Sequence, residues 1–301
     1  MGRVAPRCTS RALPSRMRRY ALKRTIVVCL ADTHGGCKVA LMNPNTELYD
    51  EDEDESIIPT PTASQDKLWG IYTEAKQTAF EFAADDEMIL IHDGDLTHGD
   101  RFKVELVSDR LADQIVIAEM NLAPWYEYPH LTRVRIIRGT GVHTMGQGSS
   151  EMIVGNYLKK AFPKVDTGYK IHSLVEIDHV PFDVAHHGPY PGGRDWLRGN
   201  VARFYLRDLM YREIRRGNIP PRIVLRAHYH QPVHEYLEMN GDASDIFILP
   251  SMSMLDEHAQ KATQSADEVT NGITLFEIID GELASFKRLY TKTDIRQREV
   301  L

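Results

Sequence analysis

Five short apolar runs in this 301-residue chain lead directly into segments that carry aspartate or histidine. Runs of this length and composition are typical of strands buried in a central sheet. The polar residues that follow them are Asp32 and His34, Asp95, His143, His186 and His187, and His228 and His230. In open α/β sheets, ligands gather beyond the carboxyl ends of the strands, so we expect these side chains to meet at one edge.

The fifth run, Ile223-Val224-Leu225, gives the clearest local pattern, because it leads into Arg226-Ala227-His228-Tyr229-His230. Residues two apart in an extended backbone point to the same side, so His228 and His230 could reach one metal ion. Taken alone, this segment fits two surface histidines on an ordinary strand end better. The four other runs with the same chemistry at their ends favour the metal site.

Helical and strand patterns alternate along the chain, which predicts an α/β fold. Helical spacing of apolar residues or a cap predicts helices over 65–84, 104–122, 150–162 and 194–216. Strands are predicted at 25–30, 88–92, 133–138, 169–177, 180–185, 222–227, 234–239, 245–249, 273–279 and 282–289. Turns at Asp178-His179, Asn240-Gly241 and Asp280-Gly281 indicate three hairpins.

Charge is distributed unevenly along the chain. Residues 1–24 carry eight basic residues and no acidic one, so we interpret them as a flexible arm or as residues ahead of a true start at Met17. This start also resembles a mitochondrial transit peptide, although Pro6 and Pro14 interrupt an amphipathic helix. The expected organisation is one domain over 25–291, an exposed acidic insertion over 42–64, and a tail over 292–301.

The chain after residue 24 is strongly acidic, which limits the partners that it is expected to bind. The formal net charge is −7 despite the basic arm, which disfavours a broad surface for nucleic acid but leaves room for a local groove. The three cysteines have no metal or redox spacing, which suits a reducing compartment. No apolar run is long enough to span a bilayer. We expect a cytoplasmic protein with no membrane partner, and the sequence indicates no oligomeric state.

Carboxylates and imidazoles at the strand ends form a mixed donor set. Divalent manganese, iron and zinc accept carboxylate oxygen together with imidazole nitrogen. The candidates outnumber the ligands of one four-coordinate ion, so two ions that share a carboxylate are the economical solution. Asp32, His34, Asp95, His186 or His187, His228 and His230 are therefore predicted to hold two divalent ions.

The order of these motifs resembles the calcineurin-like metallophosphoesterase superfamily, whose blocks are D-x-H, G-D, G-N-H-D/E, H and G-H-x-H. The matching segments cover about 25–231 of the chain. They are Asp32-Thr33-His34, Gly94-Asp95, Gly139-Thr140-Gly141-Val142-His143, His186-His187 and His228-Tyr229-His230. The resemblance implies a four-layer αββα sandwich, with two mixed β-sheets packed face to face and helices outside.

The resemblance also implies a role for each matched residue. Asp32, His34 and His230 would hold the first ion, and Asp95 would bridge both. His228 and His186, with His187 as the alternative, would hold the second ion. His143 would be the catalytic histidine. Manganese is the first choice of metal, with iron, zinc, magnesium or nickel as alternatives.

Two positions depart from the family pattern. Ala227 replaces the usual glycine before the first histidine of the last block, which is a mild change if the backbone there has ordinary angles. The asparagine that normally binds the second metal is missing, and its loop is two residues longer. Thr140 could substitute as a weak oxygen ligand, or His143 could itself bind a metal. The second ion therefore has the less complete predicted ligand set.

The implied activity is hydrolysis of a phosphomonoester or phosphodiester by a metal-bridging hydroxide, with His143 protonating the leaving oxygen. His98 could support Asp95, and Arg138 and Arg194 could clamp phosphate, although exposed charges are the commoner interpretation of both arginines. A small phosphoester is the favoured substrate. The alternatives are a DNA nuclease related to repair exonucleases and a scaffold that keeps the fold but has an impaired second metal site.

Overall fold

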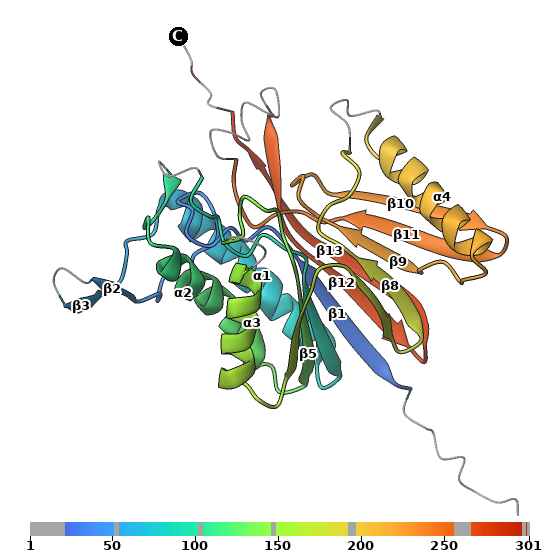
Figure 1. Ribbon diagram of the computed structural model, residues 1–301, viewed down its shortest axis with the longest axis horizontal. Coiled ribbons are helices and arrows are strands. Elements are labelled where there is room, and N and C mark those ends of the chain that lie inside the picture. The colour runs from blue at the N-terminus through green and yellow to red at the C-terminus, as the bar shows by residue number, and fades with distance from the viewer. Residues whose placement is uncertain are drawn as a thin grey trace, which may run out of the picture.

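The computed structural model describes residues 22–50, 54–101, 105–145, 149–191, 197–255, 266–296 and 299. It is an α/β structure that contains two large mixed sheets and four α-helices (Figure 1). Residues 1–21 of the basic arm, residues 51–53 of the acidic run and four residues of the tail lie outside the described part of the chain.

The first sheet has six strands, in the order β13-β12-β1-β4-β5-β6. Its parallel part consists of β1 (Arg24–Leu30), β4 (Glu87–His92), β5 (Leu131–Ile137) and β6 (Asp166–Lys170). A long antiparallel hairpin, β12 (Glu268–Ile279) and β13 (Glu282–Asp294), extends it beside β1. The predicted Asp280-Gly281 turn joins these two strands.

The second sheet has five strands, in the order β10-β11-β9-β8-β7. They are β7 (Ser173–Ile177), β8 (Val180–Val184), β9 (Ile223–Arg226), β10 (Val233–Met239) and β11 (Asp242–Ile248). Strands β8, β9 and β11 run parallel, so their carboxyl ends lie at one edge of the sheet. The predicted hairpins at Asp178-His179 and Asn240-Gly241 are both present.

Alternating side chains along β1 explain the layered core. Val28 and its neighbours two residues away belong to the cluster that contains the helices α1 (Ala63–Ala83), α2 (Leu111–Leu122) and α3 (Ser149–Ala161). Val27 and Cys29 belong instead to the cluster between the two sheets. Helix α4 (Asn200–Arg215) covers the outer face of the second sheet through its own apolar cluster (Figure 1). The predicted αββα sandwich is therefore confirmed.

The predicted strand over 169–177 is wrong, because the chain changes sheets within it. Strand β6 pairs with β5 in the first sheet, whereas β7 pairs with β8 in the second. A bend at Ile171 and His172 separates them, and the side chain of Ile171 is exposed. A continuous alternating pattern cannot reveal which sheet receives each half of a segment.

Two predicted helices begin later than expected. Helix α2 begins at Leu111, because the segment before it follows the Gly36 loop through backbone hydrogen bonds that include Val107 N to Gly36 O at 2.8 Å. Helix α4 begins at Asn200, and residues 194–196 of its predicted range lie outside the described residues. Helix α1 is close to its prediction, since Thr62 and Gln65 form a capping box at its start.

The acidic insertion carries more structure than its charge suggested. It contains a small two-stranded sheet of β2 (Leu48–Asp50) and β3 (Glu55–Ile57). Met42 and Leu48 are buried against Ile117 of α2, so apolar side chains attach the segment to the body. Among the described residues, no helix is long and apolar enough to cross a membrane.

Candidate metal centre

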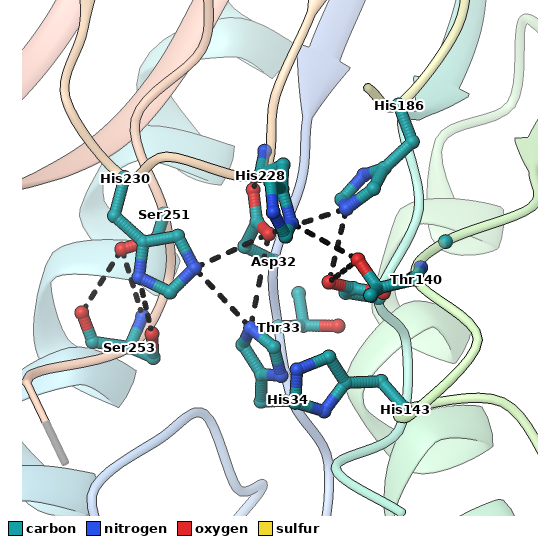
Figure 2. A network of polar contacts seen from close by, with 12 residues as sticks. Asp32, Thr33, His34, Thr140, His143, His186, His228, His230, Ser251 and Ser253 are labelled. Atoms are coloured by element: carbon teal, nitrogen blue, oxygen red, sulfur yellow. Dashed lines mark hydrogen bonds and ion pairs between the residues drawn. The ribbon is translucent and has the colours of Figure 1, made fainter. Parts of the chain in front are cut away.

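The loops after β1 and β4 run side by side at the carboxyl edge of the first sheet. The amide of Asp32 donates to the carbonyl of Gly94, and the amide of His34 donates to that of Asp95, both at 3.0 Å. The loops after β8 and β9 reach the same place from the second sheet (Figure 2). The structure therefore brings together the six predicted metal ligands, which come from four strand ends.

Asp32, His34 and His230 form one group that could hold a metal ion. The Nε2 atoms of His34 and His230 lie 3.7 and 3.2 Å from Asp32 Oδ1, and 3.3 Å from each other. Ligand atoms of all three residues lie within 4.8 Å of one another. This is the set predicted for the first ion.

Asp95, His186 and His228 form the second such group. His186 Nε2 lies 2.9 Å from Asp95 Oδ2 and 3.8 Å from Asp32 Oδ1, so its ring faces both groups. This is the set predicted for the second ion. The sheets contribute unequally to it, because Asp95 follows a strand of the first sheet and both histidines follow strands of the second.

The ring orientation of His186 suits a metal ligand. Its Nδ1 donates to the backbone carbonyl of Asp93 at 2.5 Å, which leaves Nε2 facing the carboxylates. Histidines that bind metals commonly use their second nitrogen in this way. His186 is 1% exposed, whereas its neighbour His187 is exposed and lies 3.4 Å from Thr140 Oγ1 through Nε2. The geometry therefore favours His186 over His187.

The arrangement around Asp32 fits a cation. Its Oδ1 atom is buried and accepts no hydrogen bond, although the Nε2 atoms of His230, His34 and His186 lie 3.2, 3.7 and 3.8 Å away. Buried carboxylate oxygens are normally paired, since desolvation without a partner is costly. Three imidazole nitrogens and one buried carboxylate oxygen around a common point are a donor set suited to a divalent ion.

The charges of the two groups are balanced within the site. Burial alone would raise the pKa of both carboxyls, but His230 and His186 hold the pKa of Asp32 well below its usual range, and His186 does the same for Asp95. Burial lowers the pKa of His186, yet the facing carboxylates raise it to about 10. Protons on imidazole thus compensate the carboxylates, and a bound metal would displace such protons.

The backbone is strained at five of the six candidate ligands. The φ angles of Asp32, His34, Asp95, His228 and His230 are 52°, 42°, 54°, 75° and 55°. Non-glycine residues rarely adopt these angles, and such strain concentrates at functional sites. The chain is therefore not extended at these ligands, and the loops follow left-handed backbone angles where they form the site.

Two glycines make this packing possible. A Cβ at Gly94, whose φ is 89°, would collide with the His186 ring. A Cβ at Gly139 would collide with the Asp95 carboxylate and its backbone. Both positions therefore require glycine for the second group to keep its geometry.

Thr140 lies beside Asp95 and His228 of the second group. It stands in the loop whose sequence lacks the asparagine of the family pattern. Its amide donates to Asp95 Oδ1 at 2.5 Å, and its hydroxyl donates to Asp95 Oδ2 at 3.1 Å. The same hydroxyl lies 3.0 Å from His228 Nδ1. Thr140 therefore fixes the Asp95 carboxylate and places an oxygen atom among the donors of the second ion.

His143 lies against the first group. Its Nδ1 donates to the carbonyl of His98 at 2.6 Å, and its ring centroid lies 4.5 Å from that of His34. Burial and the neighbouring His34 lower the pKa of His143 to about 4. In the neutral ring, the hydrogen bond to the carbonyl of His98 leaves a lone pair on Nε2, and the catalytic role of His143 stays a prediction.

The remaining predicted residues differ in their positions. His98 is buried, with its ring centroid 5.7 Å from that of His34, and its support of Asp95 stays a prediction. Arg138 is half-buried, and its backbone amide donates to the carbonyl of Lys170 at 2.9 Å. Arg194 lies outside the described residues.

Sequence patterns did not indicate the support of His230. Ser253 Oγ lies 3.3 Å from His230 Nδ1, and the amide of Met252 donates to the carbonyl of Asp32 at 3.1 Å. Asn271 of β12 holds this segment by donating to the carbonyls of Ser251 and Ser253. The segment follows β11, another strand that ends at this edge, but it carries neither aspartate nor histidine at its start.

Comparison with models of protein families and with curated proteins gives no match. Among solved structures, a Vps29 variant from Entamoeba histolytica is 11% identical, with a TM-score of 0.30, over 90% of this chain and 99% of that one. A Thermotoga maritima protein solved by NMR is 13% identical, with a TM-score of 0.31, over 88% and 98% of the two chains. The Thermus thermophilus sulfate thiohydrolase SoxB, in complex with glycerol, is 10% identical, with a TM-score of 0.39, over 92% of this chain and 57% of SoxB. These similarities are too weak to assign a family or an activity.

Proposed function

We propose that this chain is a phosphoesterase of the calcineurin-like type that depends on two divalent metal ions. Asp32, His34 and His230 would hold the first ion, and His186 and His228 the second, with Asp95 shared. The observation that carries the proposal is the buried Asp32 Oδ1, which has no hydrogen bond but three imidazole nitrogens within 3.8 Å. Manganese is the proposed metal, although iron and zinc accept the same mixture of carboxylate oxygen and imidazole nitrogen.

Each part of the site has a distinct task in this proposal. Bound ions would lower the pKa of water toward neutrality and neutralise charge on the phosphoryl oxygens. Thr140 holds the Asp95 carboxylate through two hydrogen bonds, and the carbonyl of Asp93 fixes the ring of His186. His143 presents its Nε2 lone pair beside His34, where it could accept a proton from water or substrate.

A small phosphoester is the proposed substrate. The arginine-rich helix α4 is a candidate surface for DNA, but Arg203 and Arg212 on it and Arg216 at its C-terminus are paired with Glu235, Asp208 and Glu213 at 2.8, 3.1 and 2.7 Å. Paired arginines offer less charge to a phosphate backbone. The proposed location is the cytoplasm, because three cysteines without metal or redox spacing suit a reducing compartment.

The test combines metal analysis with a panel of substrates. Chain loaded with Mn²⁺ is assayed on nitrophenyl phosphomonoesters and phosphodiesters, and in parallel on linear single- and double-stranded DNA. Manganese-dependent release of nitrophenol supports the proposal. Activity on DNA alone would replace it with the nuclease alternative. If no substrate is turned over with manganese, iron, zinc, magnesium or nickel, the proposal of an enzyme is overturned and the alternative of a scaffold protein is favoured.

A further inference from the structure

A third cluster of donors lies next to the first group. It consists of His34, His98 and His143, whose ligand nitrogens lie within 4.8 Å of one another. The ring centroids are 4.5 Å apart for His34 and His143, 5.4 Å for His98 and His143, and 5.7 Å for His34 and His98. Figure 2 shows the rings of His34 and His143 side by side, on the side of His34 away from His230.

Two of these histidines have a nitrogen available for a cation. Because a carbonyl only accepts, the hydrogen bond from His143 Nδ1 to the carbonyl of His98 places the proton on Nδ1 and the lone pair on Nε2. His34 Nε2 faces Asp32 and His230, whereas its Nδ1 is buried and has no hydrogen-bond partner. A buried imidazole nitrogen without a partner is costly, and a bound cation would satisfy it.

We propose that His34, His98 and His143 form a third cation site, suited to zinc, that competes with the dinuclear centre for His34. The site itself depends only on these side chains, whereas its inhibitory effect rests on the proposed function. A set of three nitrogens without carboxylate favours zinc over manganese. Nitrogens on one tetrahedral zinc lie about 3.4 Å apart, given Zn–N bonds of about 2.1 Å, so nitrogens within 4.8 Å of one another need to approach by at most about 1.4 Å.

Competition follows from the electron count of imidazole. A neutral ring has a lone pair on one nitrogen and a proton on the other. When Nδ1 of His34 binds the third cation, the ring proton resides on Nε2, and Nε2 then has no lone pair for the first ion of the dinuclear centre. Zinc in the third site therefore removes one of the three ligands of the first group.

The first experiment measures zinc binding without any enzyme assay. In the full chain carrying Asp32→Asn and Asp95→Asn, the dinuclear groups lose both carboxylates, while the three histidines remain. Equilibrium dialysis followed by metal analysis should find one zinc per chain, and adding His98→Phe should remove it. His92→Phe is the matched control, because His92 is equally buried but bonds to Thr33 at 3.1 Å, and it should retain the zinc.

If the zinc is retained after His98→Phe, or if the carboxylate variant binds no zinc at all, the proposed third site is overturned.

A second experiment covers the case in which the carboxylate variant does not fold. In the otherwise unaltered chain, excess zinc is titrated against manganese-dependent turnover, and the inhibitory concentration is compared with that of His98→Phe. The variant should need at least about tenfold more zinc, the usual effect of losing a group that supports a metal. Equal inhibition of both would contradict the competition.

If the chain has no phosphoesterase activity, the proposed function fails while the zinc count still decides the third site. The two proposals can therefore fail independently.

Discussion

At the scale of single residues, the backbone and side-chain positions of the candidate ligands cost conformational free energy. Backbone angles of the kind found at Asp32, Asp95 and His230 cost on the order of 1 to 3 kcal/mol each. Asp32 Oδ1 adds a buried oxygen that accepts no hydrogen bond. Costs of this kind persist where the surrounding structure enforces them, and here the adjacent loops do so through paired backbone hydrogen bonds.

Asp95→Asn is expected to remove most of the bound metal and most of the activity. The amide has the shape of the carboxylate but loses the charge that both ions would share. Metal content by mass spectrometry and turnover of a nitrophenyl ester check this expectation. Asp100→Asn is the control, because Asp100 is an exposed acid on the same loop. Near-normal turnover of Asp95→Asn would refute the shared role.

His143→Ala is expected to lower turnover by about a hundredfold, the lower range for loss of a proton-transferring group. Manganese content should stay unchanged, since neither carboxylate-containing group includes His143. Loss of one manganese equivalent would instead make His143 a ligand of the dinuclear centre. The two readouts, taken on the same sample, separate these roles.

Gly139→Ala is expected to disrupt the second group. The added methyl would collide with the Asp95 carboxylate, so the loop has to move and manganese binding should weaken. Gly141→Ala is a matched control two residues away, because nothing lies within 4 Å of its Cβ position. Isothermal titration with Mn²⁺ compares the two, and equal affinities would show that the loop adapts without loss.

The donors could be predicted from the sequence, but their orientation could not. Aspartate and histidine after apolar runs identify themselves by residue type. The ring orientations of His186 and His143 depend on the backbone carbonyls of Asp93 and His98, and every residue has a carbonyl. Ser253 was missed for the same reason, because it supports His230 from a segment with no distinguishing composition.

At the scale of strands and helices, the spacing of apolar residues predicted most elements. It failed where the bounds of an element depend on contacts with distant parts of the chain. The β10–β11 and β12–β13 hairpins follow from local turn residues. The division of 169–177 between two sheets depends on which strands lie nearby, and a local pattern does not contain that information. The late start of α2 likewise reflects contacts of its preceding segment with the Gly36 loop.

Asp245, His234 and Arg222 form a polar cluster on the second sheet, and the stability of the protein is expected to depend on pH through this cluster. Burial raises the pKa of Asp245, but hydrogen bonds from His234 and Arg222 outweigh this and lower it below its usual value. A depressed carboxyl pKa contributes stability that is fully present above the unfolded value of about 3.9 and is lost as the pH falls through the folded value.

Asp245→Asn should therefore lower the free energy of unfolding at pH 6, with a deficit that shrinks as the pH falls below 4. Urea denaturation at several pH values measures this deficit. Asp242→Asn, at the start of the same strand β11, is the comparison. A deficit that does not change with pH would place the effect in packing and not in charge.

At the scale of the whole molecule, the candidate centre joins the two sheets. In each group, aspartate follows a strand of the first sheet and at least one histidine follows a strand of the second. The sequence predicted this convergence through strand order and ligand type. The pairing of β1 with β12 could not be predicted, because the partners are far apart along the chain and share only a common apolar character.

Metal binding is accordingly expected to stabilise the whole sandwich. An ion that binds only the folded chain adds about 2.7 kcal/mol when present at a hundred times its dissociation constant. Chelation should lower the melting temperature, and Mn²⁺ should restore it. The same titration on Asp95→Asn is the control and should give a smaller shift. An unchanged melting temperature in both would mean that no ion bridges the sheets.

The support of His230 by Ser253 and Asn271 has a consequence for biosynthesis. Asn271 belongs to β12, so the hydrogen bonds to the carbonyls of Ser251 and Ser253 come from a residue that follows all six candidate ligands along the chain. When all six candidate ligands have left the ribosome during translation, Asn271 has not yet been added, so the segment that contacts His230 lacks its hydrogen bonds to Asn271. The candidate centre is therefore expected to reach its full set of supporting contacts only after translation has passed β12.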